Sequence, residues 1–241
     1  MSITQEKMRV TRSKVRVSIN NGECIIDIID DLNMKDLIAS ISNISAYEKG
    51  TDLQLPDSVN YNGRVLPITE IRHRAFSYTS PPVNRLIIPE GISFIEPYAF
   101  SSSSVNTVVW PSTCHGIPLG CFFCSTISTI EYDVKSIKWI GSSAFSCSNL
   151  ADFSWPLSRE CGQIPRECFM GTKIQSFKIE ENVKALYANA FDSCKIAEGK
   201  IDCKCCDHLL ITGAKDQINN LIPLLSVGID TVIETKILDY E

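Results

Sequence analysis

A phenylalanine recurs at a nearly constant interval through the middle of this chain of 241 residues. The positions are Phe76, Phe100, Phe122, Phe145, Phe169 and Phe191, so the successive steps are 24, 22, 23, 24 and 22 residues. A fixed period of about 20–50 residues is typical of solenoids, propellers and other arrays, because a single unit cannot bury its own apolar face. The repeat therefore predicts units that stack and cover one another.

Each phenylalanine stands inside the same pattern of small and apolar residues. Ala or Cys precedes it, an aliphatic residue comes five positions earlier, and an aliphatic residue or Cys comes eight positions earlier. Three apolar positions follow, the last two in alternation, as in Val108 and Trp110; the last unit, with Gly199 and Ile201, is a weaker copy. Alternation predicts a strand that sends two side chains inward.

The period and the strand pattern together favour one class of solenoid. A step near 23 residues lies inside the range of about 20–29 residues that is typical of leucine-rich repeats. The aliphatic pair before each phenylalanine predicts a second, shorter run of strand or turn on another face. The fold prediction is an α/β to mainly-β solenoid, a leucine-rich-repeat stack of about six units of 22–24 residues with a parallel sheet on one face and a cap at both ends.

Four of these units resemble a known repeat family. ITEIRHRAF, ISFIEPYAF, IKWIGSSAF and VKALYANAF are similar to the I-x-x-I-(G)-x-x-A-F signature of BspA-like leucine-rich repeats, also called the Treponema pallidum type, and LIIPEGI resembles that family's L-x-I-P-x-x-V/I. LQLPDSVNYNGRVLPITEI resembles its first unit, a strand followed by a hairpin at Asn62-Gly63. The third and fifth units depart from the signature with Cys for Ala and with Pro118 and Pro165 where Gly is usual, which predicts local irregularity there.

The resemblance covers about residues 51–203 and has consequences for function. It implies a curved or gently twisted solenoid that binds proteins. Members are often bacterial or protist surface proteins linked to adhesion, so the resemblance implies a surface antigen or adhesin at the cell surface. The N-terminal residues lack the apolar core of a secretory signal, and the eleven cysteines are an odd number, which together favour the cytoplasm. The compartment stays open.

The two ends of the chain depart from the repeat. Residues 1–50 are predicted to form an N-terminal cap with a β-hairpin that turns at Asn21-Gly22, and MKDLIASISNIS is compatible with helix or strand. Residues 51–203 are the predicted solenoid. Residues 204–241 are predicted to form a C-terminal cap, with a degenerate further repeat as the alternative: HLLITG predicts a strand, AKDQINNLIPLL has helical spacing and IDTVIETKIL is compatible with either. The whole is predicted to be one continuous domain.

Net charge and hydropathy limit the classes of partner that this chain is expected to bind. A net charge of −5 is unsuited to holding nucleic acid by phosphate neutralisation, so no nucleic-acid partner is expected. The basic run from Lys7 to Arg16 is compatible with an anionic surface or with a simple solvated strand face. No apolar run approaches the ~20 residues that a transmembrane helix needs, and no such segment is expected.

The cysteines are the residues with the most chemical potential. Cys114, Cys121, Cys161 and Cys168 fall on core positions of the repeat, which predicts packing, although Cys121 and Cys124 have redox or half-site spacing. The densest group of potential metal ligands consists of Cys203, Cys205, Cys206 and His208, and it lacks the two-residue spacing usual for zinc. We predict no metal and no cofactor, and a metal- or thiol-responsive protein that uses Cys203–Cys206 is the alternative function.

No catalytic motif accompanies these cysteines. The sequence contains three histidines and has no nucleophile elbow, phosphate loop or H-E-x-x-H motif, so an enzyme is the least expected class.

The predicted binding surface is the outward side of the parallel strands. Apolar side chains beside an arginine suit a protein partner, whereas the alternative is a solvated sheet face. The function predicted is a protein-binding leucine-rich-repeat module for adhesion or scaffolding, with partner identity and oligomeric state open. The outward residues are Arg85, Ile87, Thr107, Val109, Thr129, Glu131, Asp152, Ser154, Ser176 and Lys178.

Overall fold

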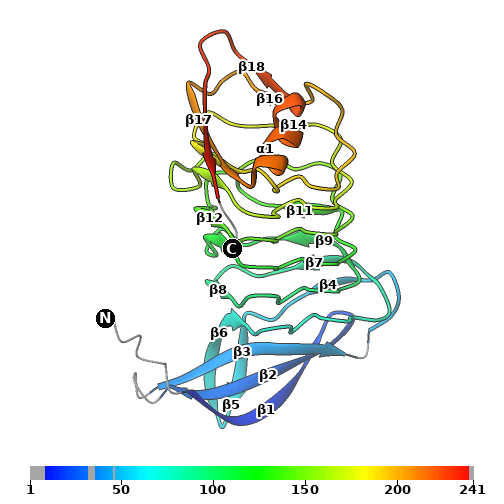
Figure 1. The fold of residues 1–241 in the computed structure, drawn as a ribbon. Coiled ribbons are helices and arrows are strands. Elements are labelled where there is room, and N and C mark those ends of the chain that lie inside the picture. Colours follow the sequence, from blue (N-terminus) through cyan, green and yellow to red (C-terminus); the bar gives the residue numbers. More distant parts are fainter. Residues whose placement is uncertain (1–8, 32–35, 46, 239–241) are drawn as a thin grey trace.

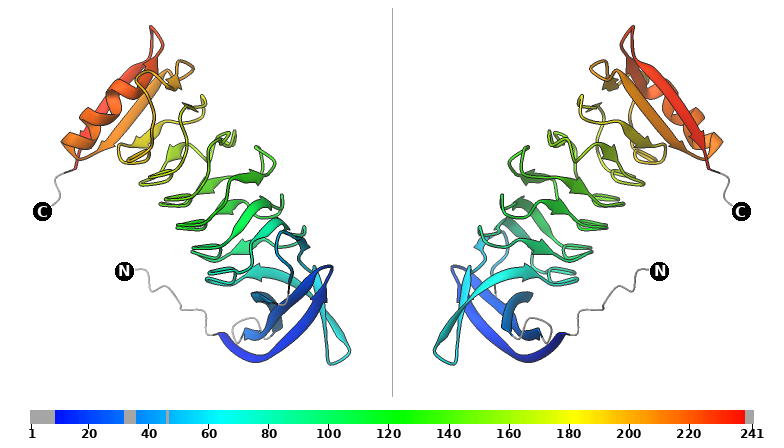
Figure 2. Two further views of the ribbon diagram at one scale, coloured as in Figure 1. Left: turned by 90° about the vertical axis from the view of Figure 1, so that its right-hand side faces the viewer. Right: turned by 90° about the vertical axis from the view of Figure 1, so that its left-hand side faces the viewer.

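The computed structural model describes residues 9–31, 36–45 and 47–238. The chain winds into stacked coils that rise from an N-terminal sheet to a short C-terminal helix (Figure 1). Side views show the coils as successive layers of one solenoid (Figure 2). The predicted caps also include residues 1–8, 32–35, 46 and 239–241, which lie outside the described residues.

Three antiparallel strands at the N-terminus cover the first coil. They are β1 (Arg9–Ile19), β2 (Gly22–Asp31) and β3 (Asp36–Ser45). The segment that the sequence left open between helix and strand is therefore strand β3, and its residues Ala39–Ile41 pair in parallel with the first coil. The hairpin prediction is confirmed with a shift of one residue: Ile19 pairs with Gly22, so Asn20 and Asn21 make the turn.

The first coil contains the predicted hairpin. Strands β5 (Ser58–Tyr61) and β6 (Arg64–Ile71) pair antiparallel, with Tyr61 opposite Arg64. The two residues between them, Asn62 and Gly63, have φ of 52° and 80°. Asparagine and glycine are the residues that most readily adopt this left-handed conformation, which explains the tight turn.

The repeat units place their strands on two faces of the solenoid. The long-strand face carries β4 (Asp52–Gln54), β7 (Val83–Ile87), β9 (Val105–Val109), β11 (Thr129–Glu131), β14 (Phe177–Lys178), β16 (Ile201–Cys203) and β18 (Leu225–Val227). The short-strand face carries β6, β8 (Phe94–Ile95), β10 (Gly116–Ile117), β12 (Trp139–Ile140), β13 (Gln163–Ile164), β15 (Ala185–Tyr187), β17 (His208–Gly213) and β19 (Val232–Ile237). The mainly-β solenoid prediction is confirmed, including the second run of strand.

The recurrent phenylalanines form one column through the core. All six are buried, and neighbouring rings stack with centroids 4.7, 5.2, 5.6, 5.7 and 5.4 Å apart from Phe76 to Phe191. The first five of these residues also bond through the backbone to the next unit: Phe100, for example, donates its N–H to the carbonyl of Cys121, and Phe145 donates to Cys168. The turns therefore form a third ladder beside the two strand ladders.

The short-strand ladder is interrupted in the two units that carry proline. In a regular unit, the residue after the buried isoleucine donates its N–H to the preceding unit, as Glu96 does to Ile71 and Gly141 does to Ile117. Pro118 and Pro165 occupy this position and have no N–H to donate. Within the described chain, β10 does not pair with β8 and β13 does not pair with β12, which confirms the predicted irregularity.

The long-strand ladder is interrupted in the fourth unit, which differs from the predicted continuous sheet. Residues 152–154 form no strand and pair with neither β11 nor β14. The connection that follows is longer here: the step from Trp155 to Ile164 is nine residues, whereas the step from Ile88 to Ile95 is seven. We attribute the missing strand to this extra length, which moves the fourth unit out of register with its neighbours.

The described residues after 203 continue both ladders. Strand β17 pairs with β15, β19 pairs with β17, and β18 pairs with β16. Helix α1 (Lys215–Leu221) and the short 3-10 helix η1 (Ile222–Leu224) take the place of the phenylalanine turn, with Ile218 and Leu221 in the core. This arrangement resembles the alternative of a degenerate further repeat, and the domain limits at 50 and 203 stay predictions.

Candidate binding surface

Six of the predicted surface residues lie side by side on three long strands. The ladder places Arg85, Thr107 and Thr129 in one row, and Ile87, Val109 and Glu131 in the next. This alignment follows from the parallel in-register pairing of β7, β9 and β11, which sets equivalent residues of successive units next to one another. Ile87 and Val109 are half-buried, so this end of the surface is less apolar than the sequence suggests.

An ion pair bridges these rows. The Arg85 Nη2 atom lies 2.6 Å from Glu131 Oε2, and Nε lies 3.3 Å from Oε1, so the guanidinium makes a two-pronged contact across the intervening strand β9. Hydrogen bonding to Glu131 raises the pKa of Arg85. Exposed pairs of this kind contribute little to stability. The pair here fixes the positions of two opposite charges on the outward side of β7 and β11.

The remaining predicted residues lie at hollows on both sides of the fourth unit. The first hollow, of about 400 Å³, is lined by Thr129, Glu131, Asp152 and Ser154 together with Tyr132 and Phe153. The second, of about 330 Å³, shares residues 152–154 and adds Ser176 and Lys178. Both hollows exist where a strand is missing from the ladder. We refer to them together as the Phe153 hollows.

Aromatic rings form the floor of the Phe153 hollows. Phe153 stacks on Tyr132 with centroids 5.6 Å apart and contacts the Phe145 ring at 4.9 Å. The Tyr132 hydroxyl donates a hydrogen bond to the Ser154 carbonyl, and burial raises the pKa of Tyr132. A side chain thus replaces the missing backbone pairing at this point.

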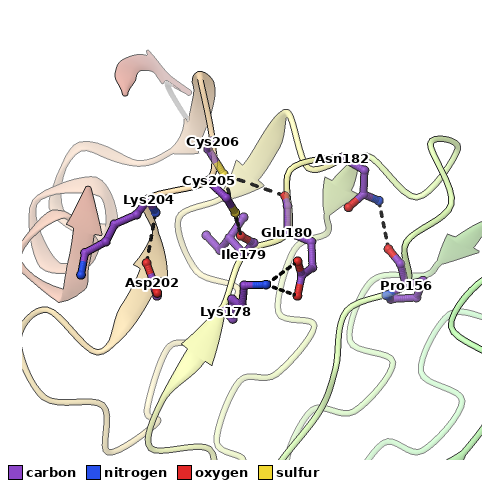
Figure 3. A network of polar contacts seen from close by, with 9 residues as sticks. All are labelled: Pro156, Lys178, Ile179, Glu180, Asn182, Asp202, Lys204, Cys205 and Cys206. Carbon is purple, nitrogen blue, oxygen red and sulfur yellow. Dashed lines mark hydrogen bonds and ion pairs between the residues drawn. The ribbon is translucent and has the colours of Figure 1, made fainter. Parts of the chain in front are cut away.

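Charged groups line the second hollow. The Lys178 ammonium donates to both carboxylate oxygens of Glu180 at 3.0 and 2.8 Å, and this bonding raises the pKa of Lys178 (Figure 3). Lys200 and Asp202 lie at the same hollow. Neighbouring Asn182 donates to the carbonyls of Pro156 and Ser158, which anchors the long connection of the fourth unit.

The predicted metal candidates do not converge on a common point. Cys203 donates to the Ser226 carbonyl, whereas Cys205 donates to the Ile179 carbonyl (Figure 3). His208 Nε2 lies 3.2 Å from Glu234. Among the residues that the structure describes, no three His, Cys, Asp or Glu side chains are placed to share a metal ion. Burial raises the pKa of Cys203 to about 11 and that of Cys206 to about 12, so both thiols are protonated near neutral pH.

The core cysteines pack as the repeat pattern predicts. Cys114, Cys121, Cys161 and Cys168 are buried, and burial raises the pKa of each thiol. Cys124 is exposed whereas Cys121 is not, so the two do not form a dithiol site. All eleven cysteines lie in the described part of the chain and are free thiols there.

The N-terminal basic run also has a structural account. Lys14 and Arg16 are exposed on β1 and alternate with the partly buried Val15 and Val17. Lys14 lies 3.6 Å from Asp27, and Arg16 lies 3.5 Å from Glu23. These contacts favour the solvated strand face; Lys7 lies outside the described residues.

A second surface, on the short-strand face, escaped the sequence analysis. Phe94, Leu119 and Trp139 are 48%, 41% and 49% exposed. A hollow of about 580 Å³ lies beside Trp139 and is also lined by Arg166 and Tyr187. The Trp139 ring rests on Gly116, where any side chain would overlap it. The sequence contains a signal for this contact. The residue before the buried isoleucine is Gly116 in the third unit and Trp139 in the fourth, so a small residue and a large one occupy equivalent positions in neighbouring units.

The repeat geometry agrees with comparisons to known proteins. Six copies of the BspA type leucine rich repeat region match residues 69–197. The chain belongs to the BspA-type leucine-rich-repeat family. Its membership supports a protein-interaction module in general and a binding role instead of an enzymatic one, without indicating a specific partner. No curated protein matched the chain significantly.

Two solved structures share this fold. The pneumococcal vaccine antigen PcpA is 21% identical with a TM-score of 0.58, and the match covers 82% of this chain and 50% of that one. A leucine-rich repeat protein from Bacteroides ovatus is 13% identical with a TM-score of 0.51, over 82% of this chain and 67% of that one. The chain thus spans about half the length of PcpA. No helix in the described residues is long and apolar enough to cross a membrane.

Proposed function

We propose that this BspA-type chain is an adhesion or scaffold module that takes a protein partner on its long-strand face. The surface extends from the Arg85–Glu131 ion pair to the Phe153 hollows. The observation that carries the proposal is the interrupted fourth unit. Two adjoining hollows with aromatic residues and hydrogen-bonding groups in their lining lie there, between the sheet that ends at β11 and the sheet that begins at β14.

The chemistry of the Phe153 hollows suits a protein segment. Interfaces concentrate their binding energy in a few side chains that fill pockets, with polar groups around them. Among the described residues, no backbone ladder bond joins residues 152–154 to either neighbouring strand. The Ser154 carbonyl accepts from Tyr132, and the peptide groups of Asp152 and Phe153 remain available to a partner's backbone. A partner would insert one side chain on each side of Phe153 and bond to the peptide groups between the two hollows.

Charge adds direction to this surface. The charged residues of the first hollow, Glu131 and Asp152, are both acidic, whereas the second hollow combines Lys178 and Lys200 with Asp152, Glu180 and Asp202. A partner segment with a basic residue at the first hollow would be oriented by this difference. Since the cysteine cluster near residue 203 gathers no metal site in the described residues, the metal-responsive alternative has no comparable support.

The test compares two faces of the same molecule. Ser154→Arg and Ser176→Arg together would fill the Phe153 hollows, while Gln163→Arg places the same side chain on the opposite face. Partners captured from the native cell by the unaltered chain would be identified by mass spectrometry and then quantified with each variant. We expect the double variant to weaken capture at least about tenfold and the control to change it less than about twofold. Capture that survives the double variant, or is lost with the control, contradicts the proposal.

A further inference from the structure

Among the described residues, strand β19 is the last strand of the short-strand sheet. It pairs with β17 over all six of its residues, from Val232 opposite His208 to Ile237 opposite Gly213. It is the last strand in the order β13-β15-β17-β19, and no described residue pairs with its other edge. Figure 2 shows it in red at the C-terminal end of the solenoid. An open edge offers unpaired N–H and C=O groups to another strand.

The phase of the ladder identifies the groups that point outward. Val232 donates its N–H to the Asp207 carbonyl, and Leu238 donates to Gly213. Successive residues of a strand point their peptide groups to opposite sides, so the even-numbered residues from 232 to 238 bond to β17. The N–H and C=O groups of Ile233, Thr235 and Ile237 therefore face the open edge.

The sequence of β19 is complementary to itself in the antiparallel direction. With Thr235 on a twofold axis, Ile233 of one copy lies opposite Ile237 of the other, and Glu234 lies opposite Lys236. Directly opposite side chains of an antiparallel pair lie on the same face and contact each other. The hydrogen-bonded pairs of such a ladder fall on residues 233, 235 and 237, the same residues whose peptide groups face outward.

The two faces of β19 suit these pairings. Ile233 and Thr235 are in register with Leu209 and Ile211, which are fully buried, so the odd-numbered residues continue the core column. Ile237 on that column is nevertheless 53% exposed. Glu234 and Lys236 are on the opposite, solvated face, where a like-charged alignment would repel and the Glu–Lys alignment attracts.

The same end of the molecule exposes further apolar side chains. Val227 and Val232 are 48% and 53% exposed, and Ile229 is fully exposed. The ends of a solenoid core require a cover, because an end unit has no neighbour on one side. Isologous contacts bring the same patch of two subunits together, which is how a self-complementary strand is used.

We propose that two copies of this chain associate through their β19 strands. The strands run antiparallel about a twofold axis at Thr235 and join the two short-strand sheets into one. Each copy covers the open core end of the other with Ile233 and Ile237, and two Glu234–Lys236 pairs fix the register.

The test is a charge exchange measured by light scattering and sedimentation. We expect the unaltered chain at about 100 μM to have twice its mass of 26.8 kDa. In a dimer of the Lys236→Glu variant, glutamates lie opposite each other at positions 234 and 236, and in a dimer of the Glu234→Lys variant lysines do. The dissociation constant of each variant's own dimer should therefore rise at least about tenfold. Mixed together, these two variants restore both Glu–Lys pairs and should form a heterodimer. Lys215→Glu on α1 makes the same charge change away from the strand and should leave the dimer intact.

Several outcomes would overturn this dimer. A monomeric unaltered chain at that concentration would do so directly. A dimer that neither exchange weakens, or one that Lys215→Glu weakens equally, would mean that the copies meet elsewhere. Failure of the two opposite variants to pair with each other, with the circular dichroism of both unchanged, would exclude the proposed register.

Discussion

Two junctions between repeat units differ in the contacts that join them. One lies between the first and second units, and the other lies between the fourth and fifth. At the first, β7 pairs with β9, β6 pairs with β8, and the turns are also bonded. At the second, neither strand ladder is present in the described chain, and the units are joined by the turn ladder, the Lys173–Leu150 backbone bond and the packing of Phe169 against Phe145 and Phe153. The comparison teaches that the phenylalanine turns hold the stack, and that strand pairing is an addition that a unit can lose.

The loss of strand pairing has a structural benefit for binding. The hollows beside Phe153 and the hollow beside Trp139 all border the fourth unit. A regular ladder leaves no such space, because its strands lie about 4.8 Å apart and their side chains meet. The irregular unit therefore gathers three hollows, and two further hollows lie near the ends of the solenoid, beside α1 and beside β4.

The largest effect should come from removing a ring at the junction without strand pairing. Phe145 contacts Phe122, Phe153 and Phe169, and its truncation to Ala should cost about 4 kcal/mol through lost burial and an unfilled cavity. Phe100→Ala removes the equivalent ring from the second unit, whose strands β8 and β9 pair with β6 and β7 of the first unit. We therefore expect a smaller loss of stability. Urea denaturation of both variants measures this order. Equal losses would mean that strand pairing adds no support.

A second effect concerns the buried thiols on either side of the fourth unit. Cys121 and Cys168 are fully buried, and burial raises the pKa of each well above its usual value. The folded state therefore retains a proton that the unfolded chain loses above about pH 9, and stability falls as the pH rises. The stability contributed by these thiols is fully present at pH 7 and is lost between about pH 9 and the raised values.

A double variant isolates this contribution. Cys121→Ala with Cys168→Ala uses the residue that other units have at this position. The free energy of unfolding should fall by about 3 kcal/mol less between pH 8 and pH 10 in this variant than in the unaltered chain. An unchanged difference between the two pH values would show that these thiols ionise normally in the fold.

Asn182 should have the next largest effect, because it supports the long connection that replaces a strand. Its amide donates to the carbonyls of Pro156, Ser158 and Cys161 at 2.9, 2.7 and 3.3 Å. Asn182→Ala leaves these carbonyls without this donor and should cost about 2 kcal/mol. Asn84→Ala is the matched control on a regular unit, where the exposed amide bonds only to Asp52, and should cost less than about 0.5 kcal/mol. Thermal denaturation of both variants would reveal any reversal of this order.

Arg85 should have the smallest effect on stability. Its pair with Glu131 is exposed, so Arg85→Ala should change the free energy of unfolding by less than about 1 kcal/mol. Partner capture, in contrast, should weaken if the long-strand face is the binding surface. A large loss of stability would show that the pair holds the three strands together instead of presenting charge.

The sequence was sufficient for the parts of the fold that repeat. Every unit restates the phenylalanine and its aliphatic neighbours, so the column and its buried rungs could be predicted. The breaks at Pro118 and Pro165 were also predictable, because proline has no backbone N–H to donate to a strand ladder. Phe153 and Trp155, however, repeat the alternation of Val108 and Trp110, and the pattern does not indicate that this strand is absent.

The candidate surface was predictable only where units stay in register. The alignment of Arg85, Thr107 and Thr129 follows directly from the repeat, whereas the Phe153 hollows depend on how two extra residues in a connection shift a whole unit. The Trp139 surface depends on a contact between a tryptophan and the glycine of the preceding unit. Such effects arise between units, and a pattern read one unit at a time does not contain them.

Native-state hydrogen exchange tests the central claim most directly, because it measures each ladder of the fourth unit separately. The amides of Phe122, Phe145 and Cys147 donate to the next unit and should be protected nearly to the global free energy of unfolding. The amides of residues 152–154 should exchange much faster. If the turn amides of the fourth unit exchange as fast as those of residues 152–154, the phenylalanine turns do not hold the stack, and the account is contradicted.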